Sequence, residues 1–173
     1  LNDKLSAKAV EVTLVDRNNY HLFLPSLYEI ASAYGMFTEK GQARLKKSVA
    51  IPYSDIFEDT NIKFVQAEIN KVDFEKKEAV SSGGNVFPYD YLVLAFGSET
   101  ETFNIPGVSE YAHKFKNVEE ALFLNQKIAD VFQKAQDKNL SGPVNFLIIG
   151  AGFNGLELAA ELVHCTKHIA HQH

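Results

Sequence analysis

A glycine-rich turn between an apolar run and a helix-like segment is the feature that most constrains this chain. Residues 144–150 form the apolar run, Gly150, Gly152 and Gly155 follow, and residues 156–162 have the composition of a helix. Strand, G-x-G-x-x-G and helix in this order form a dinucleotide-binding fingerprint. Its glycines permit a tight turn, close approach to a pyrophosphate and close helix–strand packing, while helix N–H groups face the phosphates. The sequence therefore predicts a nucleotide site here, and a plain strand–helix turn is the alternative.

The composition narrows the class of protein. The chain has 173 residues, 46% of them hydrophobic, and a formal net charge of −5. This acidic balance, without a lysine or arginine cluster along one helix, argues against a nucleic-acid partner. No uninterrupted apolar stretch is long enough to span a bilayer, and no signal peptide opens the chain.

The order of strand-like and helix-like segments predicts an α/β fold. Strands are expected at residues 10–16, 62–65, 69–74, 86–89 and 91–95, and helices at residues 26–34 and 118–136. The segment 62–89 has the turn signals of an antiparallel meander, and the run 91–95 is typical of a strand buried on both faces. Ser26 and Asn117 are predicted to cap the two helices, and residues 36–50 are predicted as a loop with some helix.

The strand at residues 10–16 ends in an acidic residue, Asp16. In a Rossmann fold, a carboxylate about 20 residues after the glycine turn accepts hydrogen bonds from a ribose. Counting back from Asp16 passes the start of the chain, so we expect the matching glycine turn to lie before residue 1. A helix cap or a loop position is the alternative interpretation of Asp16.

Several segments keep the order and spacing of a known family. They are residues 12–23 with Pro25, residues 49–52, 64–66, 89–98 and 105–107, and the turn at 150–161. Together they resemble the type II NADH dehydrogenases, which are FAD-dependent NADH:quinone oxidoreductases among the two-domain flavoproteins. The resemblance implies a Rossmann-like FAD domain at residues 1–110, lacking its first βα unit, and the start of a second Rossmann domain, for NADH, at residues 111–173.

The resemblance also implies which residues contact FAD. They are Asp16, Arg17, Asn18, Pro25, Ile69, Ala95, Phe96 and Gly97. Asp16 would hold the ribose, the backbone of Ile69 would contact the adenine, and Pro25 would lie near the isoalloxazine. Phe96 replaces the threonine that is usual in the family where the chain passes the flavin.

The resemblance assigns the second nucleotide, NAD(H), to the glycine turn. Gly150, Gly152, Asn154 and Gly155 would hold its pyrophosphate. Glu157, predicted in the first turn of the following helix, would lie near the nicotinamide as the catalytic residue. Favourable charge at a helix N-terminus is the alternative role for Glu157. Because hydride transfer is carried by the cofactors, we expect no nucleophile or general base of the hydrolase kind.

Residues near the chain's end offer two further chemistries, neither of which we predict. Glu161, His164, His168 and His171 recur at spacings of three and four, which could place zinc ligands on one helix face. A polar helix face explains them as well, and no metal is predicted. Cys165 is the only cysteine, so it is expected to be a packed small residue, and the redox cysteine pair of disulfide reductases is absent.

The predicted function is electron transfer from NADH through FAD to a quinone. The alternatives are a soluble FAD/NAD(P)H-dependent reductase of a ferredoxin-like or other protein acceptor, and a non-catalytic nucleotide-binding fragment. The resemblance implies a cytoplasmic enzyme that is peripheral on the inner face of the membrane through segments outside this chain, with a homodimer as a possible assembly. Aromatic residues that could line a quinone or flavin pocket, or simply fill the core, are Tyr20, Phe23, Tyr28 and Tyr34.

Overall fold

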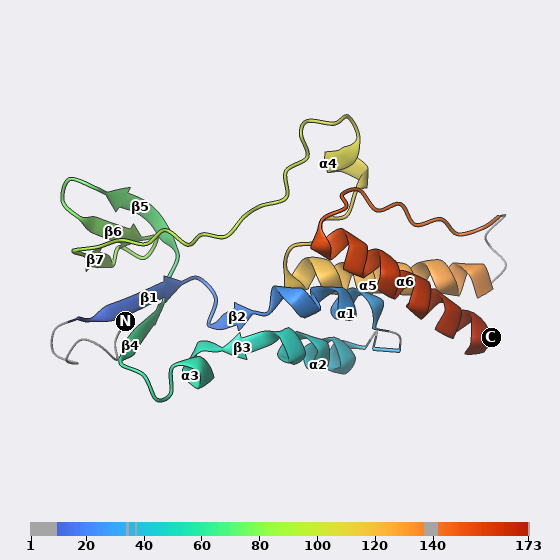
Figure 1. Ribbon diagram of the computed structural model, residues 1–173, viewed down its shortest axis with the longest axis horizontal. Helices are drawn as coiled ribbons and strands as arrows, with labels where there is room; N and C mark the ends of the chain where they lie inside the picture. The colour runs from blue at the N-terminus through green and yellow to red at the C-terminus, as the bar shows by residue number, and fades with distance from the viewer. Residues whose placement is uncertain (1–9, 34, 37, 137–141, 173) are drawn as a thin grey trace. The chain divides into compact units, whose positions relative to one another are not determined.

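The computed structural model is a mixed α/β structure that describes residues 10–33, 35–36, 38–136 and 142–172 (Figure 1). It divides into two compact units. The first is formed by the residues up to His21 together with Ile51–Gly97, and the second by Leu22–Ala50 together with the residues from Ser98 onward. The division into an FAD domain at residues 1–110 and the start of an NADH domain at residues 111–173 stays a prediction.

The first unit contains a pair of parallel strands. Strand β1 (Val12–Asp16) pairs with β4 (Ile62–Gln66), so that Asp16 lies opposite Gln66. The short helix α3 (Tyr53–Ile56) precedes β4 in the chain. Because the strands are parallel, their carboxyl ends share one edge, and the backbone N–H of Ala67 donates to the Asp16 carbonyl at 2.9 Å. The strands predicted at residues 10–16 and 62–65 are confirmed, with small shifts at their ends.

The same unit contains the predicted antiparallel meander. Strands β5 (Ile69–Asp73), β6 (Glu78–Ser81) and β7 (Val86–Pro88) pair in sequence order. The Asp73 carboxylate accepts the backbone N–H groups of Glu75 at 3.2 Å and Lys76 at 3.0 Å, which closes the first turn. The Lys76 hydrogen bond is the main cause that lowers the pKa of Asp73. Local turn chemistry therefore sets the register of this sheet.

A separate two-stranded sheet is formed by β2 (Tyr20–Leu22) and β3 (Ala50–Pro52). The hydrogen bond from the Phe23 N–H to the Val49 carbonyl, at 2.8 Å, continues the pairing at one end.

Helices make up most of the second unit. They are η2 (Leu24–Ser26), α1 (Leu27–Ser32), α2 (Glu39–Val49), α4 (Val108–Tyr111), α5 (Val118–Gln136) and α6 (Phe153–Gln172). The short helix α1 packs against both α5 and α6 (Figure 1). Its buried side chains belong to two apolar clusters. The first consists of Leu27, Ile30, Val49, Val118 and Ala121. The second consists of Ala31, Ile128, Leu158 and Leu162.

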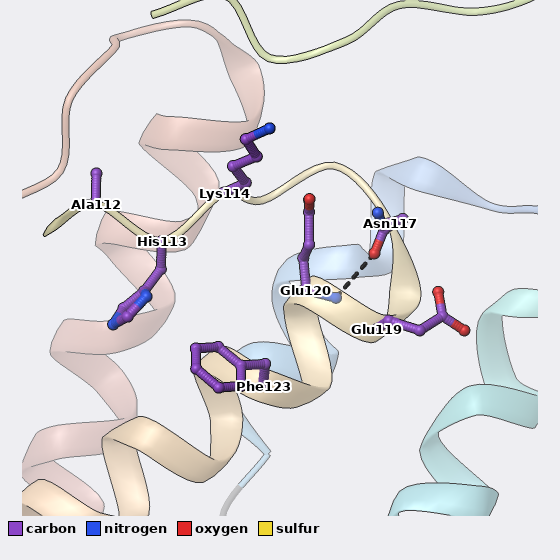
Figure 2. Close-up of a pocket in the computed structure, with 7 residues that line it drawn as sticks. All are labelled: Ala112, His113, Lys114, Asn117, Glu119, Glu120 and Phe123. Carbon is purple, nitrogen blue, oxygen red and sulfur yellow. Dashed lines mark hydrogen bonds between the residues drawn. The ribbon is translucent and has the colours of Figure 1, made fainter. Parts of the chain in front are cut away.

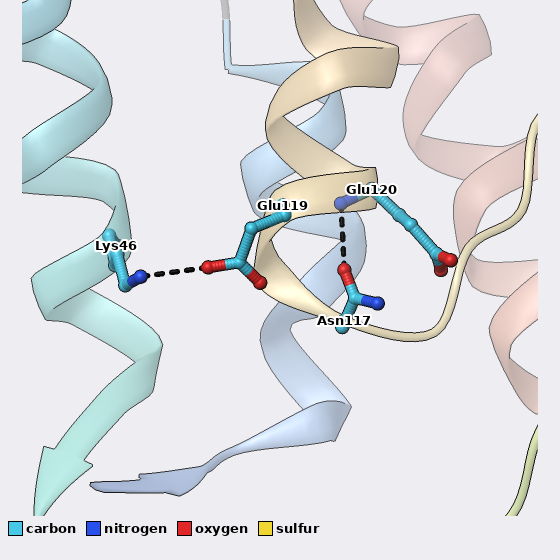
Figure 3. Close-up of polar contacts among 4 residues, drawn as sticks. All are labelled: Lys46, Asn117, Glu119 and Glu120. Carbon is cyan, nitrogen blue, oxygen red and sulfur yellow. Dashed lines mark hydrogen bonds and ion pairs between the residues drawn. The ribbon is translucent and has the colours of Figure 1, made fainter. Parts of the chain in front are cut away.

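The start of α5 is fixed by side chains that satisfy free N–H groups (Figure 3). Asn117 Oδ1 accepts the N–H of Glu120 at 2.8 Å, and Glu120 Oε2 accepts the N–H of Lys116 at 2.7 Å. Beside them, Lys46 of α2 forms an ion pair with Glu119 at 2.8 Å. The predicted Asn117 cap and the predicted helix at residues 118–136 are confirmed.

Two local predictions in the second unit are wrong. Ser26 makes no capping hydrogen bond, because it ends the η2 turn, which runs directly into α1. Within residues 36–50, predicted as a loop with some helix, Glu39–Val49 form the continuous helix α2, whose first turn is closed by the Thr38 hydroxyl accepting the N–H of Gly41 at 3.1 Å. This threonine cap was not among the predicted caps.

The two apolar runs predicted as buried strands, residues 91–95 and 144–150, are not strands. They are extended and exposed, with Tyr91 94% and Leu147 86% accessible. A strand exists only when a neighbour completes its hydrogen bonds, and no described strand lies beside either run. In the described part of the chain, no helix is long and apolar enough to cross a membrane.

Candidate functional site

The glycine turn adopts the geometry that its sequence predicts, although the run before it is not paired. Gly150 has a φ of +106°, which side-chain-bearing residues rarely adopt. Helix α6 begins three residues later at Phe153, and the Leu156 N–H donates to the Gly152 carbonyl at 3.1 Å. The preceding N–H groups of a helix start have no acceptor within the helix. The turn therefore presents free donors to an anion.

The other two glycines of the turn differ in what surrounds them. A Cβ atom added to Gly155 would lie 2.1 Å from the Gly150 carbonyl oxygen, so only glycine fits there. A Cβ atom added to Gly152 would meet no protein atom within 4 Å. Gly155 thus permits close packing inside the turn, and Gly152 borders open space that a phosphate group could fill. Asn154, the remaining predicted residue of the turn, is half-buried.

Glu157 lies one turn further along α6 than predicted. Because α6 begins at Phe153, Glu157 is its fifth residue and the first helical turn holds no acidic residue. It therefore lies beyond the free N–H groups, which weakens the interpretation of its charge as a helix-terminus effect. Its carboxylate acts on Tyr28 of α1, whose pKa is raised first by burial and then by Glu29, Glu157 and Glu161. Tyr28 is half-buried and packs against the second apolar cluster.

A second constellation lies at the carboxyl end of β1 in the first unit. Both oxygens of the Asp16 carboxylate are held by this unit. Oδ1 accepts the backbone N–H of Asn18 at 2.8 Å, and Oδ2 accepts the hydroxyl of Tyr53 at 3.0 Å. Arg17 is exposed, and its carbonyl accepts the Gln66 side-chain amide at 3.1 Å. The edge of the parallel pair thus presents a fixed, half-buried carboxylate.

Tyr53 is the residue of this constellation that the sequence analysis missed. Its side chain is 8% exposed, stacks on Phe57 with ring centroids 5.7 Å apart, and contacts Phe64 at 4.6 Å. Burial, followed by the hydrogen bond to Asp16, raises the pKa of Tyr53 to about 12. Asp16 and Tyr53 are 37 positions apart, and no local motif signals their contact.

The other predicted FAD contacts are distributed over both units. Ile69 begins β5 in the first unit, two residues after Ala67, whose N–H binds the Asp16 carbonyl. Residues 95–97 are exposed at the end of that unit, and Gly97 has a φ of +74°. Pro25 belongs to the second unit, where it is exposed in the η2 turn before α1. The first unit thus brings Asp16, Asn18 and Ile69 to one end of the parallel pair.

Two shallow hollows lie in the described part of the chain. The first, of about 340 Å³, is lined by Asn19, Pro52, Tyr53, Ser54, Phe57 and Phe64, and so adjoins the Asp16 constellation. The second, of about 450 Å³, lies over the start of α5 and is lined by Ala112, His113, Lys114, Asn117, Glu119, Glu120 and Phe123 (Figure 2). None of the predicted site residues lines this second hollow, which is consistent with a plain surface depression.

A zinc site and a reactive thiol, the two alternatives raised for residues near the chain's end, have little support. Among the described residues, no group of three or more histidine, cysteine, aspartate or glutamate side chains could hold a metal ion. The side chains of His168 and His171 lie outside the described residues. Cys165 is buried, and burial is the main cause that raises the pKa of its thiol, so little reactive thiolate forms at neutral pH.

A comparison with known families adds to this geometry. The sequence profile of the pyridine nucleotide-disulphide oxidoreductases matches residues 2–171. The chain belongs to this family. The α/β, Rossmann-type fold class predicted from the sequence is thereby confirmed.

Individual relatives of this chain are larger proteins. It is 33% identical over 179 residues to a type II NADH:quinone oxidoreductase of Staphylococcus haemolyticus, across 97% of this chain and 41% of the relative. It is 31% identical over 156 residues to a demethylphylloquinone reductase of Synechocystis sp., across 88% of this chain and 35% of that relative. The solved structure of NDH2 from Plasmodium falciparum in complex with NADH matches with a TM-score of 0.67 and 27% identity, across 92% of this chain and 33% of the solved chain. The chain therefore spans about two fifths of the length of the first relative, and the predicted resemblance is confirmed.

Proposed function

We propose that this chain is part of an FAD-dependent oxidoreductase that passes electrons from NADH to a quinone. The observation that carries the proposal is the glycine turn, in which Gly155 permits no Cβ atom and Gly152 faces open space. A turn of this kind at a helix start suits a pyrophosphate. The similarity to a type II NADH:quinone oxidoreductase favours a quinone as the acceptor.

The proposed NADH site uses the turn and helix α6. The backbone of Gly150, Gly152, Asn154 and Gly155 would bind the pyrophosphate of NADH through the free N–H groups at the start of α6. Glu157, one turn further along this helix, would lie near the nicotinamide and act on it electrostatically. No proton transfer by a side chain is needed for the hydride step itself, since nicotinamide and flavin supply that chemistry.

The proposed FAD site uses the edge of the parallel pair in the first unit. The Asp16 carboxylate would accept the ribose hydroxyls, with Arg17 and Asn18 beside it. The backbone of Ile69 would contact the adenine, and Pro25, Ala95, Phe96 and Gly97 would approach the flavin. The fit is supported by the fixed carboxylate, since each of its oxygens keeps a free lone pair after accepting one protein hydrogen bond.

We include in this proposal that the intact enzyme is cytoplasmic and binds the inner face of the membrane peripherally, where a lipid-soluble quinone resides. A homodimer is the assembly that we expect. Sedimentation of the full-length gene product with vesicles of anionic and neutral lipid tests the membrane contact. A protein that stays in the supernatant with both kinds of vesicle would contradict this part of the proposal.

The flavin and its reduction test the central proposal directly. We expect the purified full-length gene product to be yellow, to bleach when NADH is added without oxygen, and to regain its colour when a short-chain quinone is added. A colourless protein that shows no flavin absorbance after incubation with FAD would refute the oxidoreductase. A protein that bleaches with NADH but passes electrons only to a ferredoxin-like acceptor would refute the quinone.

A further inference from the structure

The hydroxyl of Tyr53 fixes the orientation of the Asp16 carboxylate. It donates to Oδ2 at 3.0 Å, while the Asn18 N–H donates to Oδ1 at 2.8 Å. With one donor on each oxygen, the carboxylate cannot rotate about its last side-chain bond without breaking one of the two hydrogen bonds. Its remaining lone pairs therefore point in fixed directions.

Tyr53 is itself held firmly, so it can impose this orientation. Its ring is stacked on Phe57 and contacts Phe64, and its backbone N–H donates to the Asn19 carbonyl at 3.1 Å. Its carbonyl in turn accepts the Phe57 N–H at 3.0 Å. Since backbone and ring are both anchored, the hydroxyl has little freedom to leave Asp16.

We propose that Tyr53 is a positioning residue, which orients the Asp16 carboxylate toward the two hydroxyl groups of the adenosine ribose of FAD. This inference rests on the proposed function, because it takes Asp16 as the ribose contact. A carboxylate that is oriented before binding loses less conformational freedom when the ribose arrives. Tyr53 therefore increases the affinity for the adenosine half of the cofactor without touching it.

The protonation state of the Tyr53 hydroxyl agrees with its role in orienting Asp16. Burial and the hydrogen bond to Asp16 raise the pKa of Tyr53 to about 12. The hydroxyl consequently keeps its proton, and remains a donor, at pH values well below about 12.

The test compares two flavins that differ in the adenosine half. FMN has no adenosine ribose, so it cannot report on Asp16, whereas FAD can. In the full-length gene product, we expect Tyr53→Phe to weaken FAD about tenfold and to leave FMN unchanged, because the hydrogen bond lost goes to a charged group. Flavin affinities are measured by fluorescence quenching on the apoprotein, whose folding is checked by circular dichroism.

Two controls separate positioning from general damage. Tyr111→Phe changes an exposed tyrosine of the second unit and should alter neither affinity. In an Asp16→Ala background, Tyr53→Phe should have no further effect on FAD, since there is no carboxylate left to orient. If Tyr53→Phe does not fold, Tyr53→Leu provides the same comparison.

The outcomes distinguish this inference from the proposed function. If the unaltered protein binds no FAD, the proposed function fails. If it binds FAD but Tyr53→Phe weakens FAD and FMN equally, or neither, Tyr53 has only a packing role and the inference is wrong. The inference is equally wrong if neither Tyr53 variant folds, because the residue is then needed for the fold itself.

Discussion

The side-chain amide of Asn125, on α5, donates a 2.8 Å hydrogen bond to the carbonyl oxygen of Ala33, just past the end of α1. The same amide donates to the Ala31 carbonyl at 3.2 Å. Asn125 is 1% exposed, and its Oδ1 has no hydrogen-bond partner among the described residues. The buried Asn125 side chain thus satisfies backbone carbonyl groups at the end of α1, the helix that contributes to both apolar clusters of the second unit.

We therefore expect Asn125→Ala to lower the free energy of unfolding by about 2 kcal/mol, because buried carbonyl groups lose their donor. The loss of the unpartnered Oδ1 offsets part of this change. Chemical denaturation of the full-length gene product measures the effect. Lys134→Ala, at an exposed position of the same helix, is the control and should change stability by less than about 0.5 kcal/mol. An Asn125→Ala variant as stable as this control would contradict the prediction.

The glycine turn predicts opposite behaviour for two similar substitutions. Gly155→Ala places a Cβ atom 2.1 Å from the Gly150 carbonyl oxygen, so the start of α6 must shift and both stability and NADH binding should fall. Gly152→Ala meets no protein atom within 4 Å, so it should leave the melting temperature nearly unchanged while weakening NADH. Calorimetric titration with NADH and thermal melting measure both properties. Unchanged NADH affinity in Gly152→Ala would remove the turn from the proposed site.

The ion pair between Lys46 and Glu119 should contribute little. The two side chains are 41% and 62% exposed, so solvent screens their attraction, and we expect Glu119→Gln to lower stability by ~0.5 kcal/mol or less. The hydrogen bond from Lys46 lowers the pKa of Glu119 below its ordinary 4.5, so this contribution is present above that pH and is lost in more acidic solution. Denaturation at two pH values and two salt concentrations measures it. A larger loss, insensitive to salt, would mean that the pair is shielded from solvent.

Alkaline titration should reveal Tyr53 as a late-ionising tyrosine. Its pKa of about 12 in the folded protein lies above the ordinary 10.0, so folding holds the proton more tightly than the unfolded chain does. The resulting stabilisation is complete below pH 10.0 and is lost as the pH rises through about 12. The ultraviolet absorbance of tyrosinate follows the step, which Tyr53→Phe should remove. A titration curve that is the same in both proteins would disagree with the buried hydrogen bond.

The features predicted correctly are mostly set by neighbours in the sequence, although the Ser26 and Thr38 caps show that local signals can also mislead, whereas features set by distant residues were not predictable. The helix at residues 118–136 was predicted to the residue because Asn117, Glu120 and the apolar spacing are all local. The run 91–95 was wrongly predicted as a strand, because pairing depends on a second strand whose presence the run itself does not signal. The same distinction between local and distant residues applies to the candidate functional site. The glycine turn was visible in six residues, whereas the contact of Tyr53 with Asp16 exists only once the chain has folded.

The two exposed apolar runs have a consequence for handling the chain by itself. Extended backbone carrying side chains such as Tyr91, Val93 and Leu147 in solvent is a template on which strands of further copies can add. Concentrated preparations of these 173 residues alone should consequently form fibrils or amorphous aggregates. Added polypeptide segments that pair with residues 91–95 and 144–150 should keep the chain in solution.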